Sequence, residues 1–183
     1  MSVLKAILVS GFILCVPVCV LGAQYKIESA ASQISFTTNH LNDGAVKGTF
    51  SEFSGSINWP PSAGQEMADV QGEVQVASLN TDNRIRDSHL KSFVFFNESK
   101  HPTISFKSEK IVTSNSGVKV VGLLTIKGES RTVTLNPTIE VTGDVLKMTG
   151  DYTLNRLEYG VSAYERIIKP EVAVRFEIVA RTR

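Results

Sequence analysis

Histidines and nearby carboxylates are the residue types in this chain that could bind a metal or carry out acid–base catalysis. They are His40, His89 and His101, with Asp43, Asp87 and Glu98. A helical zinc site needs ligands four residues apart on one face, as in H-E-x-x-H, and none of these residues has that spacing. The chain also contains no G-x-S-x-G nucleophile turn and no phosphate-binding glycine loop. The sequence therefore predicts no catalytic residues, no metal site and no cofactor.

The segment between residues 81 and 96 has a more distinctive pattern, because polar residues that suit a helix run directly into several aromatic residues. Thr81 and Asp82 are good N-cap residues, so the sequence predicts a short helix from one of them to about Ser92. The aromatic residues that follow are Phe93, Phe95 and Phe96. Bulky rings at the one break in a strand-rich chain favour a role as a gate or inner wall, with plain core packing as the alternative.

Three polar residues of the predicted helix have two possible roles. Arg86, Asp87 and His89 could hold the helix in place through an ion pair and hydrogen bonds, or they could contact the head group of a ligand. We favour the structural role. Arg156, near the other end of the chain, joins them as a candidate support at the same site.

Residues 1–23 have the pattern of a signal peptide. Lys5 supplies the positive start, an uncharged apolar run follows, and Leu21-Gly-Ala23 offers small residues for cleavage. A membrane anchor is the alternative, but the run is short for a span and contains Pro17. Both cysteines, Cys15 and Cys19, lie in this segment. The sequence thus predicts an exported domain over residues 24–183 that is held together by core burial and not by disulfides.

The charge of this domain limits its partners. Removal of residues 1–23 takes away Lys5 and leaves equal numbers of basic and acidic side chains. Such a balance gives no electrostatic footprint for nucleic acid and no polybasic attraction to an anionic membrane. After cleavage no stable membrane span is expected either. A neutral or apolar partner is favoured.

The rest of the domain consists of alternating segments that predict strands. Apolar and polar residues alternate with period two, so that each segment has one dry face and one wet face. Eight such segments are recognisable: residues 33–39, 45–58, 69–79, 103–113, 117–127, 131–141, 144–154 and 171–181. Within the second, the apolar parity flips between Phe50 and Phe53, which predicts a bulge near Ser51. Pro137 should sit at an irregular or edge position, because proline cannot donate to a ladder.

These segments predict an all-β fold, an eight-stranded antiparallel lipocalin-like barrel with one short helical insertion. Closure into a barrel removes exposed strand edges. A β-sandwich is the alternative, and an outer-membrane barrel is disfavoured because its dry face would point outward. Eight strands enclose either a side-chain-filled core or a cavity for one small ligand. The pattern alone leaves both interiors open.

If the interior is open, its wall is predicted from the dry faces of the strands together with the aromatic residues after the helix. The candidate lipid-binding residues are Phe36, Phe50, Phe53, Val74, Val76, Phe93, Phe95, Phe96, Phe106, Leu124, Ile126, Met148, Tyr152, Val174 and Phe176. For each of them, plain core packing is the alternative.

Several motifs with fixed internal spacing resemble those of one known family. Ser78-Leu-Asn-Thr81, then Arg86-Asp-Ser-His-Leu-Lys-Ser92 and Phe95-Phe96, looks like the signature of the YceI-like family of lipocalin-like, polyisoprenoid-binding proteins. The stretch 102–108 resembles its P-x-I-x-F-x-S strand, and 122–128 its G-x-L-T-I-x-G hairpin. Arg156 with Tyr159-Gly160 resembles its R-x-x-F/Y-G motif. The resemblance covers nearly the whole of residues 24–183 in order.

The resemblance implies a periplasmic protein that binds, sequesters or carries a long-chain isoprenoid or similar amphiphilic lipid inside the barrel. Members of the family are often dimeric, so the resemblance also implies a homodimer as a candidate assembly. It also implies a binding protein rather than an enzyme. The alternative is an exported structural or signalling β-domain with a filled core and no lipid cargo. The identity of the lipid is not specified by any of these motifs.

Overall fold

The computed structural model describes residues 23–41, 44–59 and 68–182. The predicted signal peptide lies outside these residues, apart from Ala23, with which the first strand begins. The strands are β1 (Ala23–Ile27), β2 (Gln33–His40), β3 (Gly44–Phe50), β4 (Phe53–Trp59), β5 (Asp69–Gln75), β6 (Leu79–Asn80), β7 (Thr103–Ser114), β8 (Gly117–Ile126), β9 (Glu129–Leu135), β10 (Thr138–Thr142), β11 (Val145–Asn155) and β12 (Ile168–Thr182). One α-helix, α1 (Arg84–Lys91), and short 3₁₀ turns complete the described elements.

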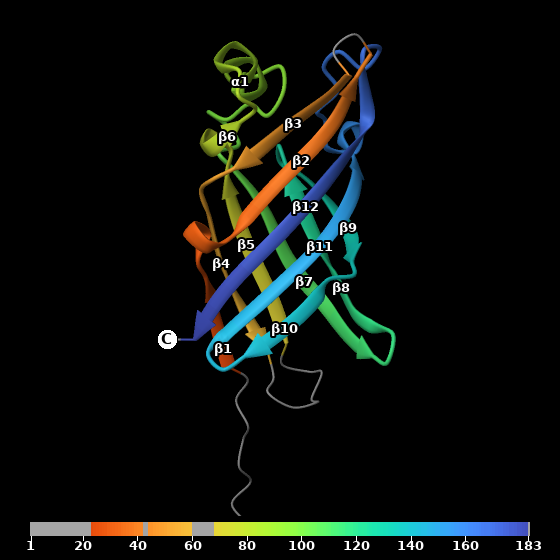
Figure 1. The fold of residues 1–183 in the computed structure, drawn as a ribbon. Coiled ribbons are helices and arrows are strands. Elements are labelled where there is room, and N and C mark those ends of the chain that lie inside the picture. Colours follow the sequence, from red (N-terminus) through yellow and green to blue (C-terminus); the bar gives the residue numbers. More distant parts are fainter. Residues whose placement is uncertain (1–22, 42–43, 60–67, 183) are drawn as a thin grey trace, which may run out of the picture.

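The strands form a closed antiparallel barrel (Figure 1). The sheet runs β6-β3-β2-β12-β1-β4-β5-β7-β8-β9, and β11 pairs with both β12 and β10. Only Asn136 and Pro137 separate β9 from β10. Because β10 pairs with β11, and β11 pairs with β12, the circuit of strands returns to β12. The longest strand, β12, pairs with β11 along one edge and with β2 and then β1 along the other. The predicted all-β barrel with a short helix is therefore confirmed.

The predicted strand count is wrong, since the described residues form twelve strand elements and not eight. The difference arises because several predicted segments are interrupted. A 3₁₀ turn at Val76–Ser78 separates β5 from β6, and Pro137 separates β9 from β10. The segment predicted to bulge near Ser51 breaks there into β3 and β4, which pair with β2 and β1 respectively. Strand β1, which lies before the first predicted segment and is separated from it by the 3₁₀ turn Ser29–Ala31, was not predicted.

The helix starts later than its capping residues predicted. Asn83 is the N-cap, and its side-chain oxygen accepts a hydrogen bond from the backbone N–H of Arg86 at 3.0 Å. Asp82 has a left-handed φ of +60°, which is incompatible with a right-handed helical turn. Thr81 lies before the helix and is buried. Figure 1 shows α1 over one end of the barrel, opposite the end where the C-terminus lies.

The main core fills the end of the barrel that lies away from α1. Ile57, Leu146 and Ala180 are fully buried there, on β4, β11 and β12. A second cluster of buried residues lies toward the α1 end, and it brings Phe95 together with Leu154 and Tyr159. The space between these two clusters is where an interior site can exist. No helix within the described residues has both the length and the apolar character needed to cross a membrane.

Candidate ligand-binding cavity

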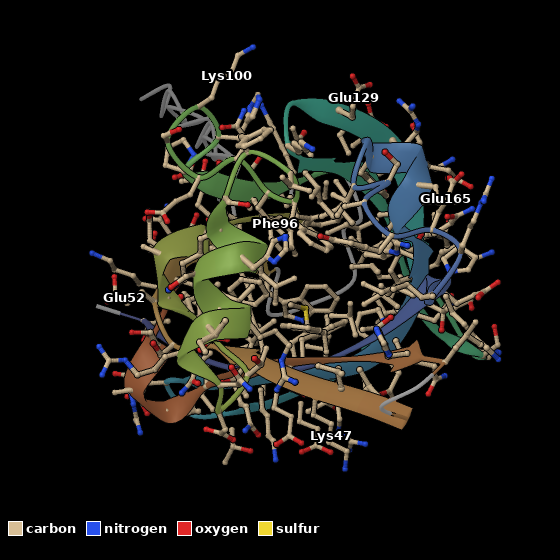
Figure 2. All side chains as sticks on the ribbon, turned by 90° about the horizontal axis from the view of Figure 1, so that it is seen from above. Lys47, Glu52, Phe96, Lys100, Glu129 and Glu165 are labelled. Carbon is tan, nitrogen blue, oxygen red and sulfur yellow. The ribbon has the colours of Figure 1, made fainter. Side chains whose placement is uncertain are left out.

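A cavity of about 690 Å³ occupies the barrel above the main core. Its floor includes Val70, Val120 and Ile178, from the upper side of that core. At the other end the lining continues to α1 and to the loop before β12, and these two segments lie on opposite sides of the opening in Figure 2. The volume falls within the range of about 300–1,000 Å³ that is typical of small-molecule sites. The interior is thus open and not filled by side chains.

Most of the predicted lining residues face this cavity, because the period-two pattern correctly sorts the strand residues into inward and outward sets. Those that line it are Phe36, Phe50, Phe53, Val74, Phe95, Phe96, Phe106, Leu124, Ile126, Met148, Tyr152, Val174 and Phe176. They come from strands on all sides of the barrel and from the segment after α1. For example, Phe36, Val174 and Tyr152 are direct neighbours across β2, β12 and β11.

Two predicted lining residues lie outside the cavity. Phe93 is 78% exposed, because the chain turns sharply after α1 and brings Phe95 inside in its place. Val76 is only 1% exposed but does not line the cavity. The alternation that would place it on the inner wall ends at Gln75, where the 3₁₀ turn begins. Neither residue forms part of the inner wall, so the predictions that placed Phe93 and Val76 there are wrong.

Phenylalanine–glycine pairs keep the aromatic rings close to the wall. Phe176 lies directly across from Gly150, and a Cβ at Gly150 would be 2.5 Å from the Phe176 ring. Phe36 lies across from Gly48 in the same relation, and its ring occupies the space that a Cβ there would need. Because the glycines have no side chain, each ring packs against the neighbouring strand. The rings therefore line the cavity without filling it.

Helix α1 is fastened to the rim through Thr81. The Asp87 carboxylate accepts hydrogen bonds from the Thr81 backbone N–H at 2.9 Å and from its hydroxyl at 2.6 Å. The Arg86 guanidinium donates to the Thr81 hydroxyl at 2.8 Å and to its backbone carbonyl at 2.6 Å. Arg86 lines the cavity, whereas Asp87 does not. Through these hydrogen bonds Arg86 and Asp87 hold the helix in place, which is the structural role that we favoured for them.

An aromatic cluster joins α1 to the opposite rim. The His89 ring lies edge-on to Phe95 and to Tyr164, with centroid distances of 5.4 and 5.6 Å, and Phe95 stacks on Tyr164 at 5.9 Å. All three residues line the cavity. Tyr164 has a left-handed φ of +54°, a conformation that costs a non-glycine residue on the order of 1 kcal/mol. We name His89, Phe95 and Tyr164 the mouth clasp.

Arg156 organises the loop that carries Tyr164. It is 5% exposed, and its guanidinium donates to the backbone carbonyls of Ala163 at 3.0 Å, Ile168 at 2.7 Å, Lys169 at 3.1 Å and Val161. Burial lowers the pKa of Arg156, and the negative charge of Glu165 opposes that change. The guanidinium remains protonated nonetheless, because arginine does not lose its proton in proteins. Arg156 thus holds one side of the mouth and also contributes to the lining.

Two tyrosines that line the cavity have raised pKa values. The pKa of Tyr159 is raised to about 12, mainly by burial and then by nearby Tyr152 and Glu158, while Arg131 opposes the change. The pKa of Tyr152 is also raised, mainly by burial and then by Glu158. Among the described residues, no group of His, Cys, Asp and Glu side chains is arranged to hold a metal ion. What the site offers is a mainly apolar chamber, with Arg86 and His89 of α1 among the polar residues that line it.

Sequence reasoning missed some residues of this chamber. Tyr164 is the clearest case, because it lies in a loop with no periodic pattern and meets His89 only through tertiary folding. Ile168 and Val172 line the cavity from the start of β12, which was predicted to begin at residue 171. Val172 belongs to the alternating pattern of the predicted segment 171–181 and could have been added to the wall. Ile168 lies before that segment, so the pattern gave no signal for it.

Comparison with known proteins identifies relatives of this chain. A model of the YceI-like domain matches residues 25–180. A UPF0312 protein of Vibrio cholerae is 32% identical over 68% of this chain and 67% of its own length. A UPF0312 protein of Pseudomonas aeruginosa is 31% identical over 68% of this chain and 65% of its own length.

Solved structures share the fold. Burkholderia cenocepacia BcnA superposes with a TM-score of 0.77 at 24% identity, covering 84% of this chain and 98% of that one. The Campylobacter jejuni YCEI protein gives 0.68 at 26% identity, covering 75% and 85%. A polyisoprenoid binding domain from Saccharophagus degradans gives 0.69 at 16% identity, covering 89% and 99%.

Proposed function

This chain belongs to the YceI-like family, and from that premise we propose that it binds a long-chain isoprenoid, or a similar amphiphilic lipid, inside the barrel. The observation that carries the proposal is the open cavity of about 690 Å³, walled by aromatic and aliphatic side chains. The alternative of a filled core with no cargo is not supported by such an interior. The Saccharophagus degradans domain, which is described as polyisoprenoid binding, has the same fold.

The apolar wall is suited to a hydrocarbon tail. Each buried CH₂ contributes about 0.8 kcal/mol, so one five-carbon isoprene unit gains roughly 4 kcal/mol before other terms. Ordering of the tail and loss of translational freedom offset much of this gain. Tails of similar length should therefore bind with similar affinity, and the polar groups at the mouth, such as Arg86 and His89, are placed to discriminate between head groups.

The cellular setting is part of the proposal. The apolar segment before residue 24 and the small residues that end it support export to the periplasm, with removal of residues 1–23. There the protein would sequester or carry its lipid as a binding protein and not as an enzyme. Mass measurement of the protein from a periplasmic extract tests this setting, since an N-terminus at Gln24 is expected and an intact N-terminus would contradict it.

A matched pair of substitutions on β12 tests lipid binding. Val174 lines the cavity, and its neighbour Ala173 is exposed on the outer face of the same strand. Val174→Trp should fill part of the chamber and reduce uptake at least tenfold, whereas Ala173→Trp should leave uptake unchanged. Uptake is measured by native mass spectrometry after incubation with a polyprenol in detergent, and thermal unfolding of both variants shows whether they are folded.

The same measurement has outcomes that would contradict the proposal. Wild-type protein that shows no adduct, either as isolated from its host's cell envelope or after incubation, would favour an interaction domain without cargo. Equal uptake by folded Val174→Trp and wild type would place the lipid somewhere other than this cavity.

A further inference from the structure

Four of the six large apolar side chains that are exposed in the described part of the chain lie at the mouth of the cavity. Among the described residues, the large hydrophobic side chains that are exposed are Leu41, Ile85, Phe93, Leu123, Val141 and Tyr164. Leu41 is in the tip between β2 and β3, Ile85 is on α1, and Phe93 follows α1. These segments and the loop that carries Tyr164 all lie at the α1 end of the barrel in Figure 1. We name Leu41, Ile85, Phe93 and Tyr164 the mouth rim.

The mouth rim is continuous with the cavity. Ile85 is 84% exposed and Tyr164 is 50% exposed, and yet both also line the cavity. The backbone N–H of Leu41 donates to the carbonyl of Ile167 at 2.9 Å, which holds the residue after β2 against the loop of Tyr164. An apolar path therefore leads from the outer surface over the rim into the chamber.

Exposed apolar side chains around an opening usually mark an interaction surface. Charges at this end are mixed, since Arg84, Lys100 and Arg166 are exposed in the same segments as Asp82 and Glu165. Figure 2 shows Lys100 and Glu165 at the periphery, outside the central opening. Attraction to an anionic surface is thus a minor contribution, and burial of the rim side chains would dominate binding.

We propose that the mouth rim docks on the surface of a phospholipid bilayer, so that lipid passes between membrane and cavity without crossing water. This inference rests on the proposed function, because a lipid cargo is what selects a membrane over other apolar partners. Exposure of apolar CH₂ groups to water opposes transfer through solution, so a long tail can exchange quickly only if the mouth meets the bilayer directly. Insertion of Leu41 and Phe93 into the bilayer surface would bring the mouth of the cavity into contact with the membrane.

The rim can be altered without touching the chamber, because Leu41 and Phe93 do not line the cavity. The test compares wild type with the double variant Leu41→Ser, Phe93→Ser. The control is Val141→Ser, which removes an exposed apolar side chain on β10 at the opposite end of the barrel (Figure 1). All proteins are purified in the processed form that the host produces, and they are mixed with phosphatidylethanolamine–phosphatidylglycerol vesicles in a flotation assay.

Wild type and Val141→Ser should float with the vesicles, and the double variant should partition about tenfold less. Its uptake of polyprenol from detergent should equal that of wild type. Failure of wild type to float, or equal flotation of the double variant, would overturn the docking proposal. Polyprenol uptake separates this failure from failure of the proposed function, since uptake without flotation leaves lipid binding intact.

Sedimentation velocity distinguishes docking on a membrane from docking on a second copy of the chain. If wild type is a dimer in solution and the double variant is a monomer, the rim is an interface between copies and the membrane proposal is overturned. If the substitutions leave the oligomeric state unchanged while flotation falls, the membrane proposal is supported.

Discussion

The two ends of the barrel are built from the same strands, and yet one end is packed solid while the other is hollow. At the end away from α1, side chains such as Ile57 and Leu146 fill the interior completely. Toward α1, Phe36 and Phe176 lie against Gly48 and Gly150, so large side chains line the wall and leave the centre open. Residue size alone does not separate a core from a cavity. For Phe36 and Phe176, the glycine opposite on the neighbouring strand leaves the room that keeps the ring against the wall.

The sharpest test of this comparison replaces a leucine at each end. Leu146 is completely buried in the main core, whereas Leu124 is half-buried and lines the cavity. Leu146→Ala should lower the free energy of unfolding by about 2–5 kcal/mol, since it leaves a void in close packing. Leu124→Ala should lower the free energy of unfolding by only about 1 kcal/mol, because the half-buried Leu124 loses less buried apolar surface than Leu146 does. Urea denaturation of both variants measures the difference, and equal losses would show that the two ends are packed alike.

A second test reduces the volume of the cavity by a substitution in its wall. In Gly150→Ala the new methyl group meets the Phe176 ring and forces it into the chamber. Overpacking of this kind costs about 1–3 kcal/mol in stability. Polyprenol binding should also fall, by about tenfold. Both quantities are measured by urea denaturation and by titration with lipid in detergent.

Gly72→Ala is the control for this substitution. Gly72 also lines the cavity, but a Cβ there would make only an ordinary contact, 3.6 Å from the Ser54 carbonyl oxygen. Binding and stability should remain close to wild type. If Gly150→Ala behaved like Gly72→Ala, the pairing of rings with glycines would not be what keeps the chamber open.

A third test opens the mouth and leaves both ends folded. Tyr164→Ala removes one ring from the mouth clasp, and Tyr164→Phe keeps the ring as the control. Aromatic pairs contribute about 0.5–1.5 kcal/mol, so release of bound polyprenol should become several-fold faster in Tyr164→Ala and stay near wild type in Tyr164→Phe. Stopped-flow transfer of lipid to acceptor vesicles measures this rate. Unchanged release from Tyr164→Ala would mean that the clasp does not control exit.

The smallest effect concerns pH. In the folded protein the pKa of Tyr159 is raised from 10.0 to about 12, chiefly by burial. The folded state therefore holds this proton more tightly than the unfolded state does, and the resulting stability is present below pH 10 and is lost between about pH 10 and 12. Alkaline unfolding should be less steep for Tyr159→Phe than for wild type over that range. Identical profiles would show that Tyr159 ionises as freely in the folded protein as in the unfolded chain.

Much of the wall could be predicted from sequence because strand geometry gives a residue's face directly. Alternation placed Phe36, Phe106 and Val174 on the inner face, and the structure agrees. The same rule failed at Val76, where a 3₁₀ turn interrupts the period. Phe93 was misplaced because the direction of a ring after a helix depends on the turn that follows, and no short pattern specifies that turn.

The sequence by itself determined the all-β class, the inward and outward face of most strand residues, the approximate position of the helix and the family. These properties are local, since period-two alternation, capping residues and motif spacing all act over a few neighbouring positions. Only the tertiary structure decided that the barrel is hollow at one end, that Tyr164 meets His89 across the mouth, and that Leu41, Ile85 and Phe93 come together with Tyr164 at the opening. Those properties depend on which residues far apart in the chain become neighbours, and strand register and closure fix that only when the whole barrel forms.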